Sequence, residues 1–339
     1  MRKQLAIWGG CAALLFASTI YYGLKYSNVK KDGVFYIKPD VRTIDSVAVN
    51  LKKENRLRVY TTFYLTAKLK LRSDNKLKPG RYRIRKNMSN LDLLRMFRYG
   101  RQEAVKFTFN SMRNMEGLCR IIDKELALKS EDFLEVLSDS INRREKFGFN
   151  ESEIMAMFIP NTYYIYWNIS AGNFIARMHT EYRKFWTEER RTKAAKHGLT
   201  PIQVSVLASI IEEETADIKE YPVIAGVYLN RLRIGMKLNA DPTLKFAAGD
   251  FSLKRLLNVH KEIDSPYNTY KYGGLPPGPI KIPSMQSIEG VLNAGKHDYL
   301  YFCAKSDFSG THVFSKTLNA HNIQARKYRE ALNKRNIYK

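Results

Sequence analysis

Hydrophobic and polar positions follow two different periods along this chain, which predicts a mixture of helices and strands. Apolar residues repeat every three or four positions in "SVAVNLKKENRL" and in "NLDLLRMFRYG", as on one face of a helix. In "GRYRIR", Tyr82 and Ile84 instead alternate with arginines, as in a half-buried strand. Both patterns recur along the chain, so the expected fold class is α+β.

Further segments extend this pattern. Val34 to Ile37 and the stretches "AVKFTF", "YLYFCA" and "THVFS" predict strands. Ser89 can cap the helix of "NLDLLRMFRYG", and Gly100 can end it. Helical repeats predict one long helix over roughly 170–197 and a basic helix from Asn319 onward, whereas "TFYLTAKLKL" fits either a helix or a strand.

The stretch "LTPIQVSVLASIIEEETAD" has the clearest helix start in the chain. Thr200 can cap the amino end, Pro201 suits the first helical position, and Gln203 completes a capping box. The apolar stripe of this helix comprises Leu207, Ile210 and Ile211.

The next member of that stripe, seven positions after Leu207, is Glu214. Glu212 and Glu213 point elsewhere, because neighbouring helical positions are rotated by about 100°. A carboxyl group on an apolar face is costly to ionise, so its pKa should rise. Such a group can stay protonated near neutral pH and donate its proton to a substrate.

The composition favours a folded protein with anionic partners. The chain has 339 residues, of which 44% are hydrophobic, so wholesale disorder is not expected. The formal net charge is +24 and the isoelectric point is about 9.8. This balance suits nucleic acid, acidic lipid headgroups or an acidic polymer, and charge alone does not choose among them.

The amino-terminal residues predict a membrane anchor. Arg2 and Lys3 precede an uncharged run from Leu5 to Leu24, and a helix of that length spans about 30 Å, the thickness of a bilayer core. Tyr21 and Tyr22 fall where an interfacial aromatic belt would lie. The alternative is a cleaved signal peptide, and in both cases the rest of the chain is exported. The expected location is the cytoplasmic membrane, crossed once, with the catalytic domain on the outer or periplasmic side.

Six segments are expected along the chain. They are a short cytoplasmic amino terminus (1–4), a transmembrane helix (5–24), a linker with the first strand (25–45), a small basic α+β module (46–104), a connecting α+β subdomain (105–198) and a catalytic domain (199–339).

Metal and nucleotide sites find no support in the sequence. The glycine-rich stretch "GGLPPGP" lacks the GxxxxGK pattern, no GxGxxG stretch is present, and the histidines at 260, 297, 312 and 321 lack metal-ligand spacing. Cys119 and Cys303 could pair in an oxidising compartment, although nothing in the sequence shows that they do. No cofactor and no metal are expected.

Carbohydrate chemistry fits the remaining inventory. Cleavage of a glycosidic bond needs a protonated acid beside the bridging oxygen. One carboxyl group suffices if a hydroxyl of the sugar itself attacks the anomeric carbon, because the same group then acts first as acid and later as base. Tyr267, Asn268, Tyr270 and Tyr301 could stack on sugar rings or bind their hydroxyl groups.

Each of these features also has a purely structural interpretation. A glutamate near the end of a helical stripe is often a boundary residue that reaches water. In "DPT", Asp241 could simply cap a short helix with Pro242 in first position. The stretches "YNTY" and "LPPG" are commonly rigid turns without a ligand.

Several segments together resemble the MltG (YceG-like) family of membrane-anchored endolytic murein transglycosylases. They are "LASIIEEETAD", "VIAGVYLNRLRIGMKLNADPTLKF", "SPYNTYKYGGLPPGPIKIPS", "YLYFCA" and "THVFSKTLNAHN", in matching order across roughly residues 200–325. "LKPGRYRIRKNMSNLDLLRMFRYGRQ" resembles the LysM-like module of that family, and "FIPNTYY" its "FPDTY" element.

The resemblance implies an enzyme with a lysozyme-like catalytic region. Such an enzyme cuts nascent glycan strands of peptidoglycan between N-acetylmuramic acid and N-acetylglucosamine, without cofactor, and leaves 1,6-anhydro-muramyl ends. Glu214 precedes Thr215 as the acid of lysozyme-like transglycosylases precedes Ser or Thr, so it takes the acid and base role, with Glu212 as competitor or supporting residue. The residues that the resemblance places along the cleft are Asn230, Arg231, Asp241, Thr243, Tyr267, Asn268, Thr269 and Tyr270, and Tyr301 joins them as a sugar-stacking candidate.

The chain departs from the family pattern in four places. Ala240 stands before "DPT" where the family usually has Ser, and Glu213 stands between the two acids where it usually has Lys. Asn161 replaces the Asp of "FPDTY", and "FNSMRN" lacks a common Glu-Gly pair. The charge of Glu213 could alter the pKa of its neighbours.

Two other functions remain open from the sequence, and a third is disfavoured. A non-catalytic, membrane-anchored scaffold would bind glycan strands without cutting them. A water-using muramidase would need a second carboxylate, for which Asp241 is a candidate. A nucleic-acid partner is not expected, because the predicted anchor argues against it and no binding module is recognisable. Peptidoglycan synthases are further candidate partners.

Overall fold

A computed structural model of the protein describes residues 25–71, 76–253 and 257–335, and the chain divides into two compact units. The first unit comprises Met1–Phe107, Ile122–Lys129 and Tyr163–Ser170. The second comprises Thr108–Ile121, Ser130–Thr162 and Ala171–Lys339. The predicted helix at 5–24 lies outside the described residues, and none of the described helices is long and apolar enough to cross a membrane.

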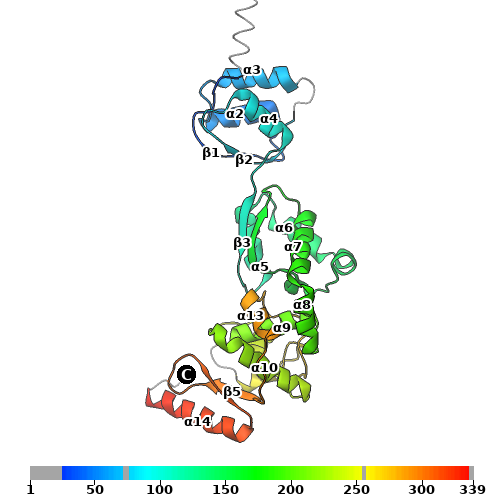
Figure 1. Ribbon diagram of the computed structural model, residues 1–339, viewed down its shortest axis with the longest axis vertical. Helices are drawn as coiled ribbons and strands as arrows, with labels where there is room; N and C mark the ends of the chain where they lie inside the picture. The colour runs from blue at the N-terminus through cyan, green and yellow to red at the C-terminus, as the bar shows by residue number, and fades with distance from the viewer. Residues whose placement is uncertain (1–24, 72–75, 254–256, 336–339) are drawn as a thin grey trace, which may run out of the picture. The chain divides into compact units, whose positions relative to one another are not determined.

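The first unit packs helices on a small antiparallel sheet (Figure 1). Its elements are β1 (Gly33–Ile37), α2 (Ile44–Lys53), α3 (Tyr60–Leu71), β2 (Gly80–Ile84) and α4 (Asn90–Tyr99). Phe35, Tyr82 and Phe97 form its aromatic centre, with ring centroids 5.7 Å and 4.9 Å from Phe97.

The local rules of the sequence explain these elements. Ser89 accepts a hydrogen bond from the backbone of Asp92 and starts α4, and Gly100 ends it in the left-handed conformation that glycine adopts without strain. The strand expected at 34–37 is present as β1, and the ambiguous stretch "TFYLTAKLKL" is the helix α3.

β3 (Val105–Phe109) pairs with β4 (Asn161–Ile165), and the boundary between the units crosses both strands. Several short helical segments lie between them in the sequence. They are α5 (Met115–Glu125), α6 (Ser130–Ser138), the π-helical turn η1 (Asn142–Lys146) and the 3₁₀ turn η2 (Ile154–Met157).

The long helix expected over 170–197 is wrong, because the chain breaks it in two. α7 (Ala171–Phe185) ends before Thr187, whose side chain accepts a hydrogen bond from the backbone of Arg190 and starts α8 (Glu188–Lys196). A threonine that caps a new helix competes with continuation of the old one, and the repeat of apolar residues does not register that competition.

The second unit is built around α9 (Pro201–Glu214), which packs against α10 (Tyr221–Arg233), α11 (Asp241–Ala248) and α13 (Met285–Leu292). Its other elements are η3 (Ile218–Glu220), α12 (Asn258–Lys261), the paired strands β5 (Tyr301–Ala304) and β6 (His312–Ser315), and α14 (Leu318–Lys334), which lies against these strands (Figure 1). The predicted capping box of Thr200 and Gln203 is confirmed. The observed mixture of helices and antiparallel strands is α+β, as expected.

Candidate functional site

Glu214 is the last residue of α9, at the point where a buried helix reaches a cavity. The helix is continuously buried from Val204 to Ile211, whereas Glu214 is half-buried. The cavity has a volume of about 110 Å³. Its lining residues are Arg113, Glu213, Glu214, Asp241, Pro242, Lys245, Phe251, Ile280 and Lys281. The stripe that carries Glu214 therefore leads out of the core into a small, highly charged hollow.

Burial raises the pKa of Glu214 to about 7. The hydroxyl of buried Tyr228 donates a hydrogen bond of 2.6 Å to Glu214 Oε1 and moderates this rise, as do the charges of Arg231 and Lys245, whereas Asp241 adds to it. The raised pKa expected from the apolar stripe is thus present. A carboxyl group with this pKa is about half protonated at neutral pH and can both donate and accept a proton.

Glu212 has the opposite electrostatic character. Its burial opposes ionisation, but hydrogen bonds to its Oε2 from the backbone of Ser284 (2.7 Å) and the hydroxyl of Ser287 (2.9 Å), with Lys281 at 3.4 Å from Oε1, leave its pKa below the ordinary value. Ser284 is the residue that caps α13. Glu212 is therefore an ionised group that fastens the start of α13 to α9.

Glu213, the unusual third acid, belongs to the rim of the cavity. Lys281 lies 2.8 Å from its carboxylate and Arg113 lies 3.7 Å from it. The two cations neutralise the extra negative charge, so Glu213 does not stand beside Glu214 as an isolated like charge.

Asp241 lies in the same cavity as Glu214, but it does not cap its helix as the sequence suggested. The cap position of α11 is Ala240, and Asp241 is the first helical residue. Its carboxylate accepts a hydrogen bond from the hydroxyl of Tyr270 instead. Of the predicted site residues, Glu214 and Asp241 therefore line the same cavity, and Tyr270 is bound to Asp241.

Thr243, Asn268 and Thr269 are buried residues that brace the cavity wall. The Thr269 hydroxyl accepts the backbone N–H of Ala240 at 2.9 Å and lies 2.8 Å from the Thr243 hydroxyl. The side-chain amide of Asn268 donates to two carbonyls of the preceding turn, at 2.9 and 2.8 Å. These contacts hold the start of α11 against the loop that carries Tyr270, and none of the three residues lines the cavity. Tyr267, on the same loop, packs on Phe246 with centroids 4.5 Å apart.

Arg231 is a buried cation that ties three segments together. It donates hydrogen bonds to the carbonyls of Leu300 (2.7 Å) and Leu238 (2.5 Å), and its guanidinium lies 5.5 Å from the ring of Tyr301 and 5.9 Å from that of Tyr228. The charge of Arg231 lowers the pKa of Glu214, and its guanidinium contacts the ring of Tyr228, the residue that binds Glu214. Tyr301 packs against the same guanidinium.

Asn230 binds a different loop. Its amide donates to the carbonyls of His297 (2.7 Å) and Tyr299 (3.1 Å). This loop approaches α10 so closely that a Cβ at Gly226 would lie 2.6 Å from the carbonyl of Gly295. Asn230 therefore anchors the chain that leads into β5 and does not line the cavity of Glu214.

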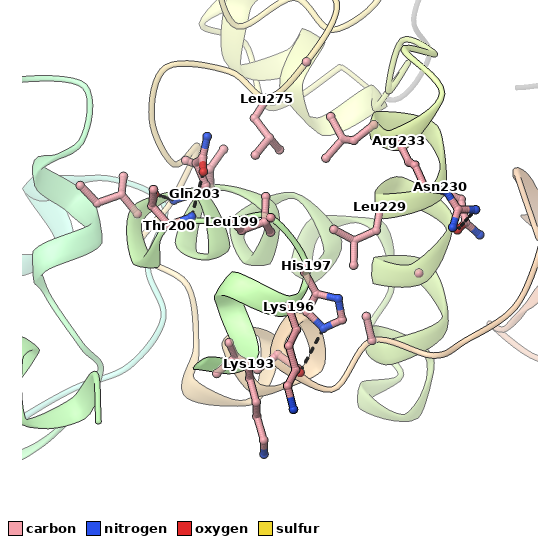
Figure 2. A pocket seen from close by; sticks show the side chains of 18 of the residues that line it. Lys193, Lys196, His197, Leu199, Thr200, Gln203, Leu229, Asn230, Arg233 and Leu275 are labelled. Carbon is pink, nitrogen blue, oxygen red and sulfur yellow. Dashed lines mark hydrogen bonds between the residues drawn. The ribbon is translucent and has the colours of Figure 1, made fainter. Parts of the chain in front are cut away.

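Asn230 instead lines a larger hollow of about 1560 Å³ on a different face of α10 from Tyr228. Figure 2 shows Leu199, Leu229 and Leu275 around this hollow, with His197 at the end of α8 and Arg233 on α10. Leu275, Pro276 and Pro277 of the "LPPG" stretch also line it. Glu214 and Asp241 are not among its lining residues, so this larger hollow is separate from the cavity that contains the two acids.

Tyr228 and Lys245 are functional candidates that sequence reasoning did not single out. Tyr228 follows its neighbours in the apolar pattern of α10, so nothing in the sequence distinguishes it from a core residue. Lys245 lies four positions after Asp241 and hence on the same face of α11, which is a signal that the sequence does contain. Lys245 has no ion-pair partner among the residues that the structure describes.

Within the described ranges, no group of three or more His, Cys, Asp or Glu side chains could hold a metal ion. Cys119 is buried, Cys303 is half-buried, and the two are not joined by a disulfide.

Comparison with known families now adds to this geometry. The family model described as "YceG-like family" matches residues 35–327. The chain belongs to the YceG-like family. A crystal structure of a yceG-like protein from Listeria monocytogenes superposes with a TM-score of 0.54 at 26% sequence identity, and covers 87% of this chain and 99% of that one.

Two curated relatives carry the name endolytic murein transglycosylase. That of Bacillus subtilis is 43% identical over 150 residues, or 44% of this chain and 41% of the relative. That of Streptococcus pneumoniae is 29% identical over 296 residues, or 78% of this chain and 53% of the relative. The chain thus spans about half the length of the curated relatives that it matches.

The contrast between Glu214 and Glu212 predicts opposite effects on stability. In the folded protein the pKa of Glu214 is raised from 4.5 to about 7, so folding binds a proton and wild-type stability declines as pH rises through that interval. Glu214→Gln cannot ionise, so it should match the wild type near pH 4.5 and exceed it at pH 8 by about 1–3 kcal/mol. Urea unfolding at the two pH values measures this difference.

Glu212→Gln is the matched control. The pKa of Glu212 is lowered, so the stability it contributes is present above its unfolded pKa and is lost as pH falls through the folded one. This variant should be less stable than the wild type at pH 8, by about 1–3 kcal/mol. Equal destabilisation by both substitutions at pH 8 would contradict the assignment of a protonated and an ionised glutamate.

Proposed function

We propose that this protein is an endolytic lytic transglycosylase of peptidoglycan, with Glu214 as its acid and base. The observation that carries the proposal is a carboxyl group of pKa about 7 that ends a buried helix and lines a cavity. Relatives of this chain are named endolytic murein transglycosylases, and the YceG-like family assignment supports the same class of substrate.

The reaction requires two proton transfers at one side chain. Protonated Glu214 donates to the oxygen that bridges N-acetylmuramic acid and N-acetylglucosamine, and the bond from this oxygen to the anomeric carbon breaks. The resulting carboxylate then accepts the proton of the 6-hydroxyl group of the muramic residue while that oxygen bonds to the anomeric carbon. The products are a free N-acetylglucosamine end and a 1,6-anhydro-muramyl end, and Glu214 is protonated again.

The surroundings of Glu214 suit both halves of this cycle. Burial favours the protonated form that donates first. The Tyr228 hydroxyl, at 2.6 Å, stabilises the carboxylate that forms next and keeps Oε1 occupied, which leaves Oε2 as the oxygen for substrate. Lys245 and Arg231 contribute positive charge during the same interval. The proposal needs no cofactor.

Asp241 offers the second carboxylate that a hydrolytic mechanism would require, since it lines the same cavity. Its hydrogen bond from Tyr270 and its repulsive effect on the ionised form of Glu214 also suit a simpler role, namely keeping Glu214 protonated. We therefore assign Asp241 to pKa control.

The remaining parts of the proposal concern location. Residues 46–104 would serve as a LysM-like glycan-binding module, 105–198 as a connecting subdomain and 199–339 as the catalytic domain. Residues 5–24 would anchor the protein in the cytoplasmic membrane, with the catalytic domain outside and peptidoglycan synthases as neighbours. The exposed lysines and arginines of a chain with net charge +24 suit anionic surroundings of this kind.

Glu214→Gln should abolish cleavage of purified murein, with a fall in rate of at least about 1000-fold, because the amide can neither donate nor accept the proton. Mass spectrometry of digested sacculi measures the products, and pull-down with insoluble murein measures binding, which should persist. Glu212→Gln, assayed at a temperature where it remains folded, should keep substantial activity.

Three results would count against this assignment. Anhydro products from Glu214→Gln would remove this residue from the reaction. Reducing muramic ends from the wild type would indicate hydrolysis with Asp241 as the second carboxylate. Binding of murein without any cleavage by the wild type would favour the non-catalytic scaffold.

The turnover number should fall as pH rises above about 7, because ionised Glu214 cannot start the reaction.

Lys245→Met removes a charge that lowers the pKa of Glu214, so this descending limb of the pH profile should move to higher pH. Lys219→Met, at an exposed position outside the cavity, is the control and should leave the limb in place. A limb that moves to lower pH in Lys245→Met would contradict the proposed electrostatics.

A further inference from the structure

Glu220 is a buried carboxylate that follows Glu214 by six positions in the sequence and does not line the cavity of Glu214. Glu220 occupies the cap position of α10, yet its side chain makes no capping hydrogen bond. Instead it accepts three hydrogen bonds from elsewhere. They come from the Thr215 hydroxyl (2.9 Å), the His312 backbone N–H (2.7 Å) and His312 Nδ1 (2.8 Å).

The cost of burying this carboxylate indicates that its partners matter. Glu220 is only 7% exposed, and burial opposes its ionisation. The hydrogen bonds from His312 and Thr215 outweigh burial, so the pKa of Glu220 is lower than usual. Because an ionised carboxylate only accepts hydrogen bonds, His312 Nδ1 must carry the proton that it shares with Glu220.

These contacts close a ring around Glu214. Thr215 directly follows Glu214 and ends α9 in an extended conformation. From Glu220 the ring continues to His312 on β6, whose imidazole packs edge-on against Phe302 at 5.3 Å. Phe302 in turn packs edge-on against Tyr228 at 5.9 Å, and Tyr228 donates its hydrogen bond to Glu214.

We propose that Glu220 is a positioning residue, which fixes the end of α9 to the β5–β6 hairpin and thereby holds Glu214 against Tyr228. Glu214 is held by its peptide bond to Thr215 at the backbone and by the hydrogen bond from Tyr228 at its carboxyl group. Without the link at Thr215, the last turn of α9 can fray toward solvent, as helix ends without fixed partners do. The proposal rests on the assignment of Glu214 in the proposed function.

The charged and titratable groups that act on the pKa of Glu214 or surround its cavity are Tyr228, Asp241, Arg231, Lys245, Tyr270, Arg113, Glu213 and Lys281. Glu220 is not among them, so removal of its charge should affect Glu214 through position. A Glu214 side chain that moves toward water loses part of its burial, and its pKa should therefore fall toward the ordinary value.

The decisive variants change Thr215 and not Glu220. In Glu220→Gln the amide NH₂ would face the donors of Thr215 and His312, and the hairpin could unfold. Thr215→Val removes the hydroxyl and keeps the shape, whereas Thr215→Ser keeps the hydroxyl. Thr215→Val should lower the turnover number by roughly 10- to 100-fold with little change in KM, and should move the descending pH limb of activity to lower pH. Thr215→Ser should restore both properties.

A measurement independent of activity completes the test. The pKa of Glu214 can be obtained from the pH dependence of unfolding, as the difference between each protein with Glu214 and the same protein with Glu214→Gln. It should be lower in Thr215→Val than in the wild type. This readout works even if the wild type yields no anhydro products, so a failure of the proposed function and a failure of the positioning role are distinguishable.

Circular dichroism at the assay temperature verifies that each variant is folded. If folded Thr215→Val keeps both the turnover number and the Glu214 pKa of the wild type, the positioning role of Glu220 is overturned. A lower melting temperature with an unchanged pKa would equally overturn it, because that result describes a merely structural contact.

Discussion

The site depends on the burial of one carboxyl group at the place where an apolar helix leaves the core. Eight consecutive residues of α9, Val204 to Ile211, are buried, so the helix has almost no freedom to rotate or slide. This rigidity carries Glu214 into its cavity and keeps water from surrounding it fully. The energetic cost of that environment is what raises its pKa to about 7.

Three neighbouring glutamates on one helix show how environment divides identical side chains into different roles. Glu212 meets hydrogen-bond donors at the start of α13 and is ionised. Glu213 meets Lys281 and Arg113 at the rim. Glu214 meets one neutral hydroxyl and a mixture of charges. The rotation of about 100° between successive positions is sufficient to expose each to a different partner.

Local and periodic features of the fold could be predicted from the sequence, and long-range pairings could not. The capping box of α9, the cap of α4 by Ser89 and the strands β1, β5 and β6 follow from neighbouring residues. The break at Thr187 and the cap of α11 at Ala240 were missed, because each depends on a competition that apolar periodicity does not measure. Ala240 has no side chain that could cap the helix, and its backbone N–H is bound by Thr269, which lies 29 positions away.

The same distinction holds within the site. The apolar stripe predicts which of the three acids has a raised pKa, whereas Tyr228, the hydrogen-bond partner of Glu214, cannot be distinguished by sequence from an ordinary core residue of α10. Asn230 and Thr243 were candidates only through the family resemblance, and the structure places both as braces of loops outside the cavity.

Gly226 shows how little tolerance the back of the second unit has. The chain from Gly295 to His297 lies directly on the backbone of α10, within the space that even a methyl group would need. Asn230 binds the carbonyl of His297 in this segment and that of Tyr299 just beyond it, before the chain enters β5. A side chain at Gly226 would therefore push the segment from Gly295 to His297 away from α10. Because this segment leads into β5, the β5–β6 hairpin would be displaced with it.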